Sequence, residues 1–235
     1  MSEPMQLKDL PEFCTAVKMW LKDRYPSEEA ERIWNATSQQ YEAYLEELPD
    51  YGGKKNTHAA GLYGGILIFS LYPQLPDQPP IEELQEFVSG MFMGGFVRLG
   101  KIFDLNRSAD MWLIDKIFHI VGKKDRRQIR QYPATFGNVS EPYDKEHHAA
   151  RYHFTQCPHA EFAKQHGLLH VLPLLCNADY WGMEQLHGAL IRHGTCGNAD
   201  CCDYCIVGSE NPLAKEYEIV KDEKGFLVSR KIEEK

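Results

Sequence analysis

The side chains best suited to chemistry are concentrated in one stretch of the chain. Six of the seven cysteines lie between Cys157 and Cys205, and eight of the ten histidines lie between His147 and His193. Thiols and imidazoles act as nucleophiles, proton carriers and ligands for soft metals. We therefore expect the chemistry of this protein to lie within residues 147–208.

Composition and charge limit the possible partners. The chain has 235 residues, enough to bury a sizeable core, and its net charge of -8 offers no basic face for nucleic acid. The one basic cluster, residues 123–130, is interpreted as a solvated helix face. The longest apolar stretch, residues 61–71, is too short to span a bilayer, and the N-terminus does not resemble a signal peptide. The sequence thus predicts a cytoplasmic protein with a small-molecule substrate, and neither nucleic acid nor membrane as a partner.

The spacing of the last cysteines raises the possibility of a metal site. In the reducing cytosol, clustered cysteines are reactive or metal-binding more often than disulfide-bonded. Cys196, Cys201 and Cys205, with Cys176, form a candidate ligand set, and the Cys202–Cys205 spacing is a common half-site for zinc or an iron–sulfur cluster. On a strand, residues 202 and 205 would point to opposite faces, which argues against shared ligation. The cofactor is left open between zinc, iron–sulfur and none.

The first half of the chain predicts helices. The spacing of apolar residues favours helices over residues 7–22, 27–48, 55–72, 81–103 and 107–121, with a proline-rich linker at Pro73–Pro80. The third helix contains Gly61, Gly64 and Gly65, which allow either close helix packing or the approach of a ligand to the backbone; packing is the favoured interpretation. This apolar helix could equally serve the interface of a homo-oligomer.

The second half predicts strands and short helices. We expect a strand at 150–156, a helix at 158–166, partial helix at 168–176 and a helix start at 177–179. Strands at 189–195 and 202–207 are expected to form one hairpin, and strands at 217–220 and 226–230 a second. The predicted fold is α+β, with a helical region at residues 1–132 and a Cys/His-rich region at 133–235. The latter holds a small antiparallel sheet with helices on one face, and the two regions could form one continuous domain.

An ordered set of motifs in this second region resembles the L-2-amino-thiazoline-4-carboxylic acid hydrolase family. The motifs are Cys157-Pro after a strand, Cys176-x-x-Asp179, Arg192-x-x-Thr195 and Cys202-Asp203-Tyr204. The resemblance covers Ala150–Val207 well and the N-terminal helices only loosely. In layout the region is also similar to four-vinyl reductase and haem-nitric-oxide-binding small domains. The chain departs from the family pattern by carrying Cys196 and Cys205.

The resemblance implies a hydrolase that adds water at C2 of a 2-aminothiazoline and releases N-carbamoyl-cysteine. In a thiolate route, Cys157 is the leading nucleophile, because a helix N-terminus beside it would lower its pKa. His187 or His153 could act as the base, and Asp179 or Asp203 could hold the protonated amidine. Arg192 could bind the substrate carboxylate through its fork.

A metal route remains open beside the thiolate route. Here a metal would activate the water, and its ligands would be Cys157, Cys176, His187 and Cys202. The sequence-based assignment takes Cys157, Asp179, His187, Cys202 and Asp203 as catalytic, and Arg192 and His153 as substrate-binding. The assignment of Cys176, Cys196, Cys201 and Cys205 is to metal.

Other interpretations compete with the hydrolase. Free cysteines often only pack in a core, and Arg192 could simply pair with Asp203 across the hairpin. The protein could also be a metalloprotein with a cysteine-ligated zinc or iron–sulfur site, or a small-molecule or metal-binding sensor module. Stoichiometric metal would favour the metalloprotein, whereas loss of activity on thiol alkylation would favour the thiolate hydrolase.

Overall fold

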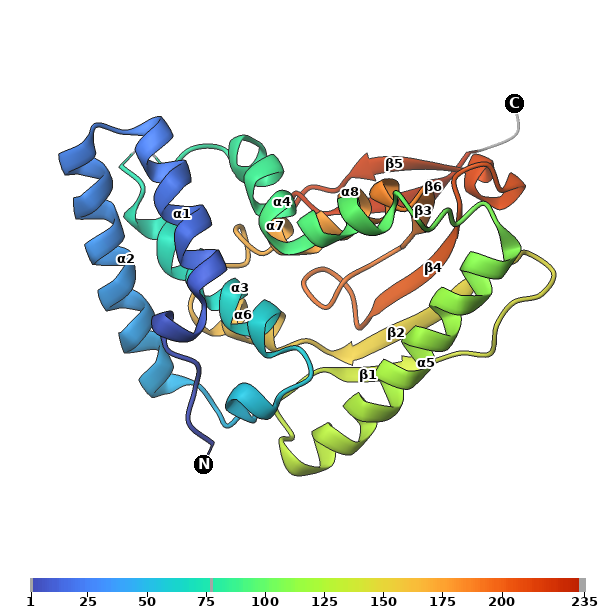
Figure 1. Cartoon of the computed structure of the whole chain (residues 1–235), viewed down its shortest axis with the longest axis horizontal. Coiled ribbons are helices and arrows are strands. Elements are labelled where there is room, and N and C mark those ends of the chain that lie inside the picture. The colour runs from blue at the N-terminus through green and yellow to red at the C-terminus, as the bar shows by residue number, and fades with distance from the viewer. Residues whose placement is uncertain (1, 77, 233–235) are drawn as a thin grey trace.

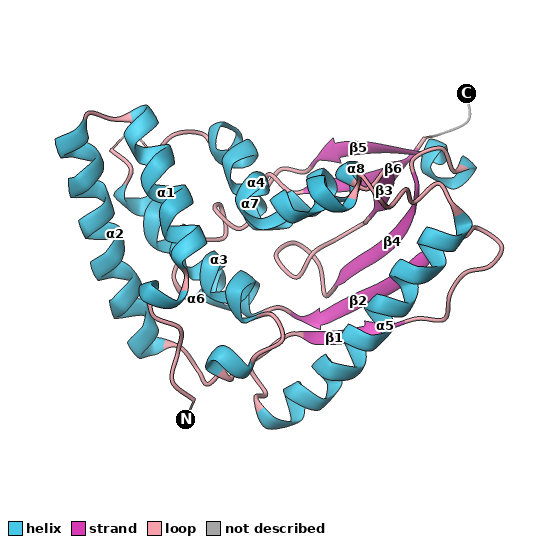
Figure 2. Ribbon diagram, in the orientation of Figure 1, coloured by secondary structure: helices cyan, strands magenta, loops and turns pink. Residues whose placement is uncertain are grey.

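The computed structural model describes residues 2–76 and 78–232 and confirms an α+β fold (Figures 1 and 2). The helices are α1 (Pro11–Arg24), α2 (Ser27–Glu47), α3 (Ala59–Leu71), α4 (Glu82–Leu99), α5 (Ser108–Gln131), α6 (Pro158–Gln165), α7 (Pro173–Cys176) and α8 (Ala178–Gln185). The strands are β1 (Gly137–Ser140), β2 (Ala150–Gln156), β3 (Gly188–Ile191), β4 (Cys202–Gly208), β5 (Tyr217–Lys221) and β6 (Leu227–Lys231). The start of the predicted helical region, residue 77 of the predicted linker and the last three residues of the predicted C-terminal region lie outside the described residues.

Helix α3 forms the centre of the helical part. Residues 62–71 of this helix are all buried, as expected for a helix that is apolar all round. Helix α2 packs on it through a stripe at helical spacing that includes Ile33, Tyr41 and Leu45. Figure 2 shows α1 and α2 side by side at the end of the molecule away from the sheet. Helix α3 in turn packs against α6 of the C-terminal region.

The glycines of α3 support the packing interpretation at two positions, and the third lies at a cavity. A Cβ atom at Gly64 would collide with the ring of Phe13, and one at Gly65 would collide with the ring of His159. These two glycines therefore allow α3 to pack closely against its neighbours. A Cβ atom at Gly61 would meet nothing within 4 Å, because this glycine borders a cavity.

The larger sheet is antiparallel, with strand order β1-β2-β4-β3 (Figure 1). In the β2–β4 pair, Tyr152 lies opposite Tyr204 and Phe154 lies opposite Cys202. Since side chains alternate along a strand, these four share one face. Helices α5 and α8 pack against this face, with the ring of Phe118 4.9 Å from that of Tyr152. The prediction that helices cover one face of the sheet is confirmed.

Most strand predictions agree with the structure. The strand at 150–156 and both hairpins are present, and Gly225 in the second hairpin has the positive φ of +89° that favours glycine. Strand β3 ends at Ile191 rather than Thr195, because the backbone N–H of Arg192 donates to the Ser229 hydroxyl instead of continuing the ladder with β4.

Two elements differ from the prediction. Helix α5 continues to Gln131, so the basic cluster at 123–130 forms its last turns. Strand β1, with the sequence Gly-Asn-Val-Ser, was not predicted, because it lacks a run of alternating apolar residues. Within the described ranges, no helix is long and apolar enough to cross a membrane.

Candidate functional site

A cavity of about 230 Å³ lies where the helical part meets the larger sheet. It is lined by His58, Gly61, Leu62, Phe92, Met93, Phe136, Phe154, Cys157, His159, Leu175, Cys176, Asp179, Cys202 and Tyr204. The walls come from α3, α4, β2, α6, α7, α8 and β4. Apolar pockets with a few convergent polar groups are the usual form of small-molecule sites. This cavity is therefore the candidate active site.

Four of the residues predicted from the sequence meet in this cavity: Cys157, Cys176, Cys202 and Asp179. Cys157 follows β2 and precedes α6, Cys176 ends α7, and Cys202 begins β4. Cys157 and Cys202 come together because β2 and β4 are neighbouring antiparallel strands, and the end of one lies beside the start of the other. The pairing of β2 with β4, which the sequence analysis did not predict, thus accounts for the meeting of residues that are 45 positions apart in the sequence.

Burial dominates the acidity of the Cys157 thiol. Desolvation raises its pKa to about 12, while the backbone amides of Ala160 and His159 at the start of α6 act in the opposite direction. The expected effect of the helix N-terminus is present, but the expected lowering of the pKa is wrong, since desolvation outweighs it. An additional positive charge in the cavity is needed to favour the thiolate.

Cys196 contacts the site through Cys202. The two sulfur atoms are 3.6 Å apart, and the backbone N–H of Cys196 donates to the Cys202 sulfur at 3.1 Å. The hydrogen bond from the Cys202 thiol lowers the pKa of Cys196 and raises that of Cys202. Cys202 therefore remains protonated, and Cys196 is the acidic member of the pair.

One carboxylate oxygen of Asp179 accepts hydrogen bonds from two donors. Its Oδ2 accepts hydrogen bonds from Arg192 Nη1 at 2.9 Å and from the Tyr204 hydroxyl at 2.8 Å. No described residue donates to its Oδ1, and Asp179 lines the cavity. Burial raises the pKa of Asp179, and Arg192 and Tyr204 oppose that rise. The free oxygen can accept an N–H group from a bound molecule.

Arg192 has no exposed surface and is surrounded by its own partners. Besides Asp179, it donates through Nη2 to the carbonyls of Cys176 at 3.0 Å and Leu227 at 3.4 Å. Its Cζ lies 4.9 Å from the ring of Tyr180 and 5.6 Å from that of Tyr204. The guanidinium does not line the cavity, so the carboxylate-binding role expected from the sequence lacks geometric support. Its ion-pair partner is Asp179, not Asp203 as the alternative interpretation held.

A histidine that was not among the predicted site residues lies at the cavity wall. His58 directly precedes α3, and its Nε2 is 2.9 Å from Oδ1 and 3.0 Å from Oδ2 of Asp125. The Asp125 side chain is 1% exposed, and Asn138 Nδ2 donates to it at 2.9 Å. A buried carboxylate that orients an imidazole is the arrangement of a general base. The available signal was Asp125 itself, the single acid in the basic run 123–130.

The second histidine of the cavity, His159, has no carboxylate partner among the described residues and is buried in the wall. His159 Nε2 donates to the carbonyl of Leu62 at 3.0 Å, and the ring stands 5.7 Å from that of Phe136. Burial lowers the pKa of His159 to about 4. The ring is therefore neutral at pH 7 and forms part of the wall between α3 and α6.

The lowered pKa of His159 makes stability depend on pH. Its unfolded value is 6.5 and its folded value about 4, so the unfolded chain binds the proton first. The contribution is complete above pH 6.5 and is lost as the pH falls toward 4, by at most about 3 kcal/mol. We expect the stability of the wild type relative to His159→Gln, which does not titrate, to fall by about 2 kcal/mol between pH 7.5 and 4.5. Urea denaturation at both pH values measures this difference, and parallel changes in the two proteins would contradict it.

Two of the predicted site residues, both on strands, lie on the face of the sheet away from the cavity. His153 and Asp203 are opposite each other on β2 and β4, on the face that does not carry Phe154 and Cys202. His153 contacts Glu141, and Asp203 accepts from the backbone N–H groups of His193 and Gly194. The alternation of strand side chains separates both from Cys157.

His187 is exposed and occupies the turn before β3, with φ of +57°. Its Nε2 lies 3.3 Å from the carbonyl oxygen of Gly100. The ring thus belongs to the contact between this turn and the end of α4, and it does not line the cavity. The structure brings neither predicted base to Cys157.

The four cysteines assigned to metal are not grouped. Cys205 packs on the far face of β4 in a small apolar cluster, and Cys201 lies half-buried in the turn before β4. As expected from strand alternation, Cys202 and Cys205 face opposite sides. In residues 2–76 and 78–232, no three His, Cys, Asp or Glu side chains are close enough together to hold a metal ion. The metal assignment of Cys176, Cys196, Cys201 and Cys205 has no supporting geometry.

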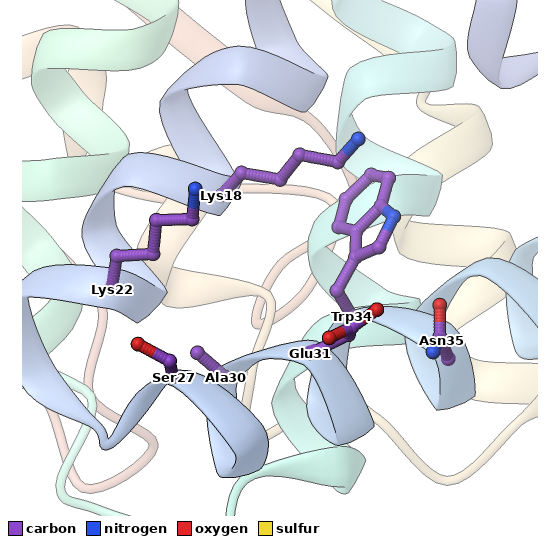
Figure 3. Close-up of a pocket in the computed structure, with 7 residues that line it drawn as sticks. All are labelled: Lys18, Lys22, Ser27, Ala30, Glu31, Trp34 and Asn35. Carbon is purple, nitrogen blue, oxygen red and sulfur yellow. The ribbon is translucent and has the colours of Figure 1, made fainter.

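A larger hollow, of about 560 Å³, lies between α1 and α2 (Figure 3). It is lined by Lys18, Lys22, Ser27, Ala30, Glu31, Trp34 and Asn35. The Nζ of Lys18 lies 4.6 Å from the centre of the Trp34 ring, and Figure 3 shows the two side chains reaching toward each other. No thiol or imidazole lines this hollow, so it lacks the groups that the chemistry requires.

Comparison with protein families identifies residues 79–206 as L-2-amino-thiazoline-4-carboxylic acid hydrolase. The matched segment contains Cys157, Cys176, Asp179 and Cys202, whereas His58 lies before it. Neither the curated proteins nor the solved structures contain a match to this chain. Because the match covers more than half of the sequence, the chain belongs to the L-2-amino-thiazoline-4-carboxylic acid hydrolase family.

Proposed function

We propose that the protein is a hydrolase that opens a small cyclic amidine through a covalent intermediate on Cys157. The observation that carries the proposal is the meeting of Cys157, Asp179 and His58 in one apolar cavity. A nucleophile, an amidine acceptor and a base are the three groups that the reaction requires. The membership of the chain in a hydrolase family supports the reaction class.

The cavity has the properties needed to bind an amidinium. The free Oδ1 of Asp179 can accept one of its N–H groups. The rings of Phe92, Phe136, Phe154 and Tyr204 line the same space. Aromatic faces attract cations, and this attraction increases where water is excluded. A bound amidinium also supplies the positive charge that lowers the pKa of the Cys157 thiol.

In the first half of the reaction, the Cys157 sulfur adds to C2 of the ring while its proton passes to His58, directly or through one water. Because Nε2–H of His58 is donated to Asp125, Nδ1 is the nitrogen that accepts the proton. The bond from C2 to the ring sulfur then breaks, and His58 returns the proton to the departing thiolate. The product of this half is an open chain attached to Cys157 as an isothiourea.

In the second half, His58 takes a proton from a water molecule that adds to the same carbon. The bond between this carbon and the Cys157 sulfur breaks, and the sulfur leaves as the thiol once the proton returns from His58. One water is consumed, no electron is transferred, and the product is a urea with a free thiol. A 2-aminothiazoline-4-carboxylate would in this way give N-carbamoyl-cysteine.

Thiol release tests the proposal directly. The purified protein, at catalytic concentration, is incubated with 2-amino-2-thiazoline and with its 4-carboxylate, and new thiol is measured with a chromogenic disulfide. We expect more than one equivalent of thiol per protein chain, and inhibition by prior alkylation with iodoacetamide. Intact-mass spectrometry under turnover should show the added mass of substrate. The proposal would be overturned if neither compound gave any thiol release or any adduct.

The pairing of His58 with Asp125 leads to a specific expectation. Asp125→Asn retains the size of the side chain but favours the wrong imidazole tautomer, so kcat should fall by about 10² to 10⁴ with little change in KM. The matched control is Asp203→Asn, which removes a carboxylate that contacts His193 on the far face of the sheet. Circular dichroism confirms that both variants fold. Equal kcat values for the two would show that His58 is not the base.

A further inference from the structure

We propose that this site prefers a cyclic amidine without a carboxylate, such as 2-amino-2-thiazoline, over the 4-carboxylate in the name of its family. The inference rests on the proposed function and concerns the chemical class of its substrate. A 2-aminothiazoline-4-carboxylate carries a cationic amidine and an anionic carboxylate. The cavity has a partner for the first group and none for the second.

The cavity wall lacks a free cation. Among the described residues that line it, none is lysine or arginine, and the basic groups are His58 and His159. His159 already donates its Nε2–H to the carbonyl of Leu62 and is neutral at pH 7. His58 is paired with Asp125, so the charge of its protonated ring is balanced within the protein. Neither histidine offers uncompensated positive charge to a carboxylate.

Arg192, the ion-pair partner of Asp179, is not placed to bind a carboxylate in the cavity. Its two terminal nitrogens are bonded to Asp179, Cys176 and Leu227, and the side chain has no exposed surface. The rings of Tyr180 and Tyr204 lie within 6 Å of its Cζ. To reach a ligand, Arg192 would have to break its ion pair with Asp179. The proposed binding of the amidine depends on Asp179 being held in place by this pair.

The remaining groups favour a ligand with a single positive charge. The positive charge of Arg192 is matched by Asp179, and the rest of the wall is mostly apolar, with four aromatic rings. A carboxylate placed here loses its hydration without a counter-ion and lies near another carboxylate. The amidinium, in contrast, gains Asp179 Oδ1 and the aromatic faces. The volume of about 230 Å³ also lies below the range of drug-sized sites and suits one small ring.

The test compares three probes: 2-amino-2-thiazoline, its 4-carboxylate and the methyl ester of that carboxylate. The ester controls for size, because it is larger than the carboxylate but lacks the negative charge. We expect kcat/KM for 2-amino-2-thiazoline to exceed that for the 4-carboxylate by roughly 10- to 100-fold, with the ester between them. Calorimetric Kd values for Cys157→Ala should follow the same order, independently of turnover.

The outcomes separate this inference from the proposed function. Tighter binding or faster turnover of the 4-carboxylate overturns the inference and leaves the hydrolase assignment intact. The expected binding order without any turnover by the wild type supports the inference and removes the proposed function. Failure of all three probes to bind Cys157→Ala overturns the inference.

Discussion

We expect the replacement of Cys157 with alanine to abolish the proposed opening of cyclic amidines, with a fall in kcat of at least about 10³. The variant lacks the sulfur that would form the proposed covalent intermediate, while the cavity walls with Asp179 and the aromatic rings stay in place. Binding measured by calorimetry should therefore change little. Intact-mass spectrometry should detect an adduct on the wild type and none on the variant.

Cys205→Ala is the matched control for this experiment. Cys205 is as buried as Cys157, but it packs with Val207 on the far face of β4 and does not line the cavity. Its replacement should leave kcat unchanged. A Cys157→Ala protein that keeps its activity, together with an inactive Cys202→Ala protein, would move the nucleophile to Cys202 and contradict the assignment.

Replacing Asp179 with alanine destabilises the protein by about 3–5 kcal/mol, because it leaves the charge of Arg192 buried without a counter-ion. In the native structure Arg192 has no exposed surface, so its charge depends on Asp179 rather than on solvent. Urea denaturation measures the change in the free energy of unfolding. The matched control is Asp203→Ala, which removes an ion pair with the exposed His193 and the hydrogen bonds from the backbone N–H groups of His193 and Gly194, and it should cost less, about 1–2 kcal/mol.

A double-mutant cycle shows whether the loss comes from the unpaired charge. Asp179→Leu combined with Arg192→Met removes both charges and keeps comparable volume, so it should regain most of the stability that Asp179→Leu loses. If the loss of stability in the double variant equals the sum of the losses in the two single variants, the ion pair does not explain the effect.

The strands that carry or adjoin Cys157 and Cys202 were predictable because they depend on local patterns, whereas the pairing of β2 with β4 was not predicted. Alternating residues at 150–156 and the hairpin at 189–207 indicated the strands, and β2 and β4 then bring Cys157 and Cys202 to one end of the sheet. The same alternation sets His153 and Asp203 on the opposite face. Side chains alternate between the two faces along each of these strands, and this period alone excludes His153 and Asp203 from the site.

The pairing of His58, the proposed base, with Asp125 was not predictable in this way. His58 and Asp125 are separated by 67 residues, and their contact depends on how α3 and α5 are placed by the core. No sequence period links a residue before one helix to a residue near the end of another. Likewise, the sequence suggested Asp203 as the ion-pair partner of Arg192, whereas the structure pairs this arginine with Asp179. The choice of Asp179 follows from the early end of β3, which directs the arginine between α8 and β4.

The walls of the cavity come from sequence-distant segments: α3 and α4 belong to the helical part, and β2, α6, α7, α8 and β4 belong to the C-terminal part. A molecule bound there contacts both groups of segments at once, so its binding free energy adds to the free energy of unfolding. At a free concentration 100 times Kd, this addition is about 2.7 kcal/mol. Occupancy therefore lowers the population of open states on which proteases act. We therefore expect a molecule that binds in the cavity to slow the proteolysis of the chain.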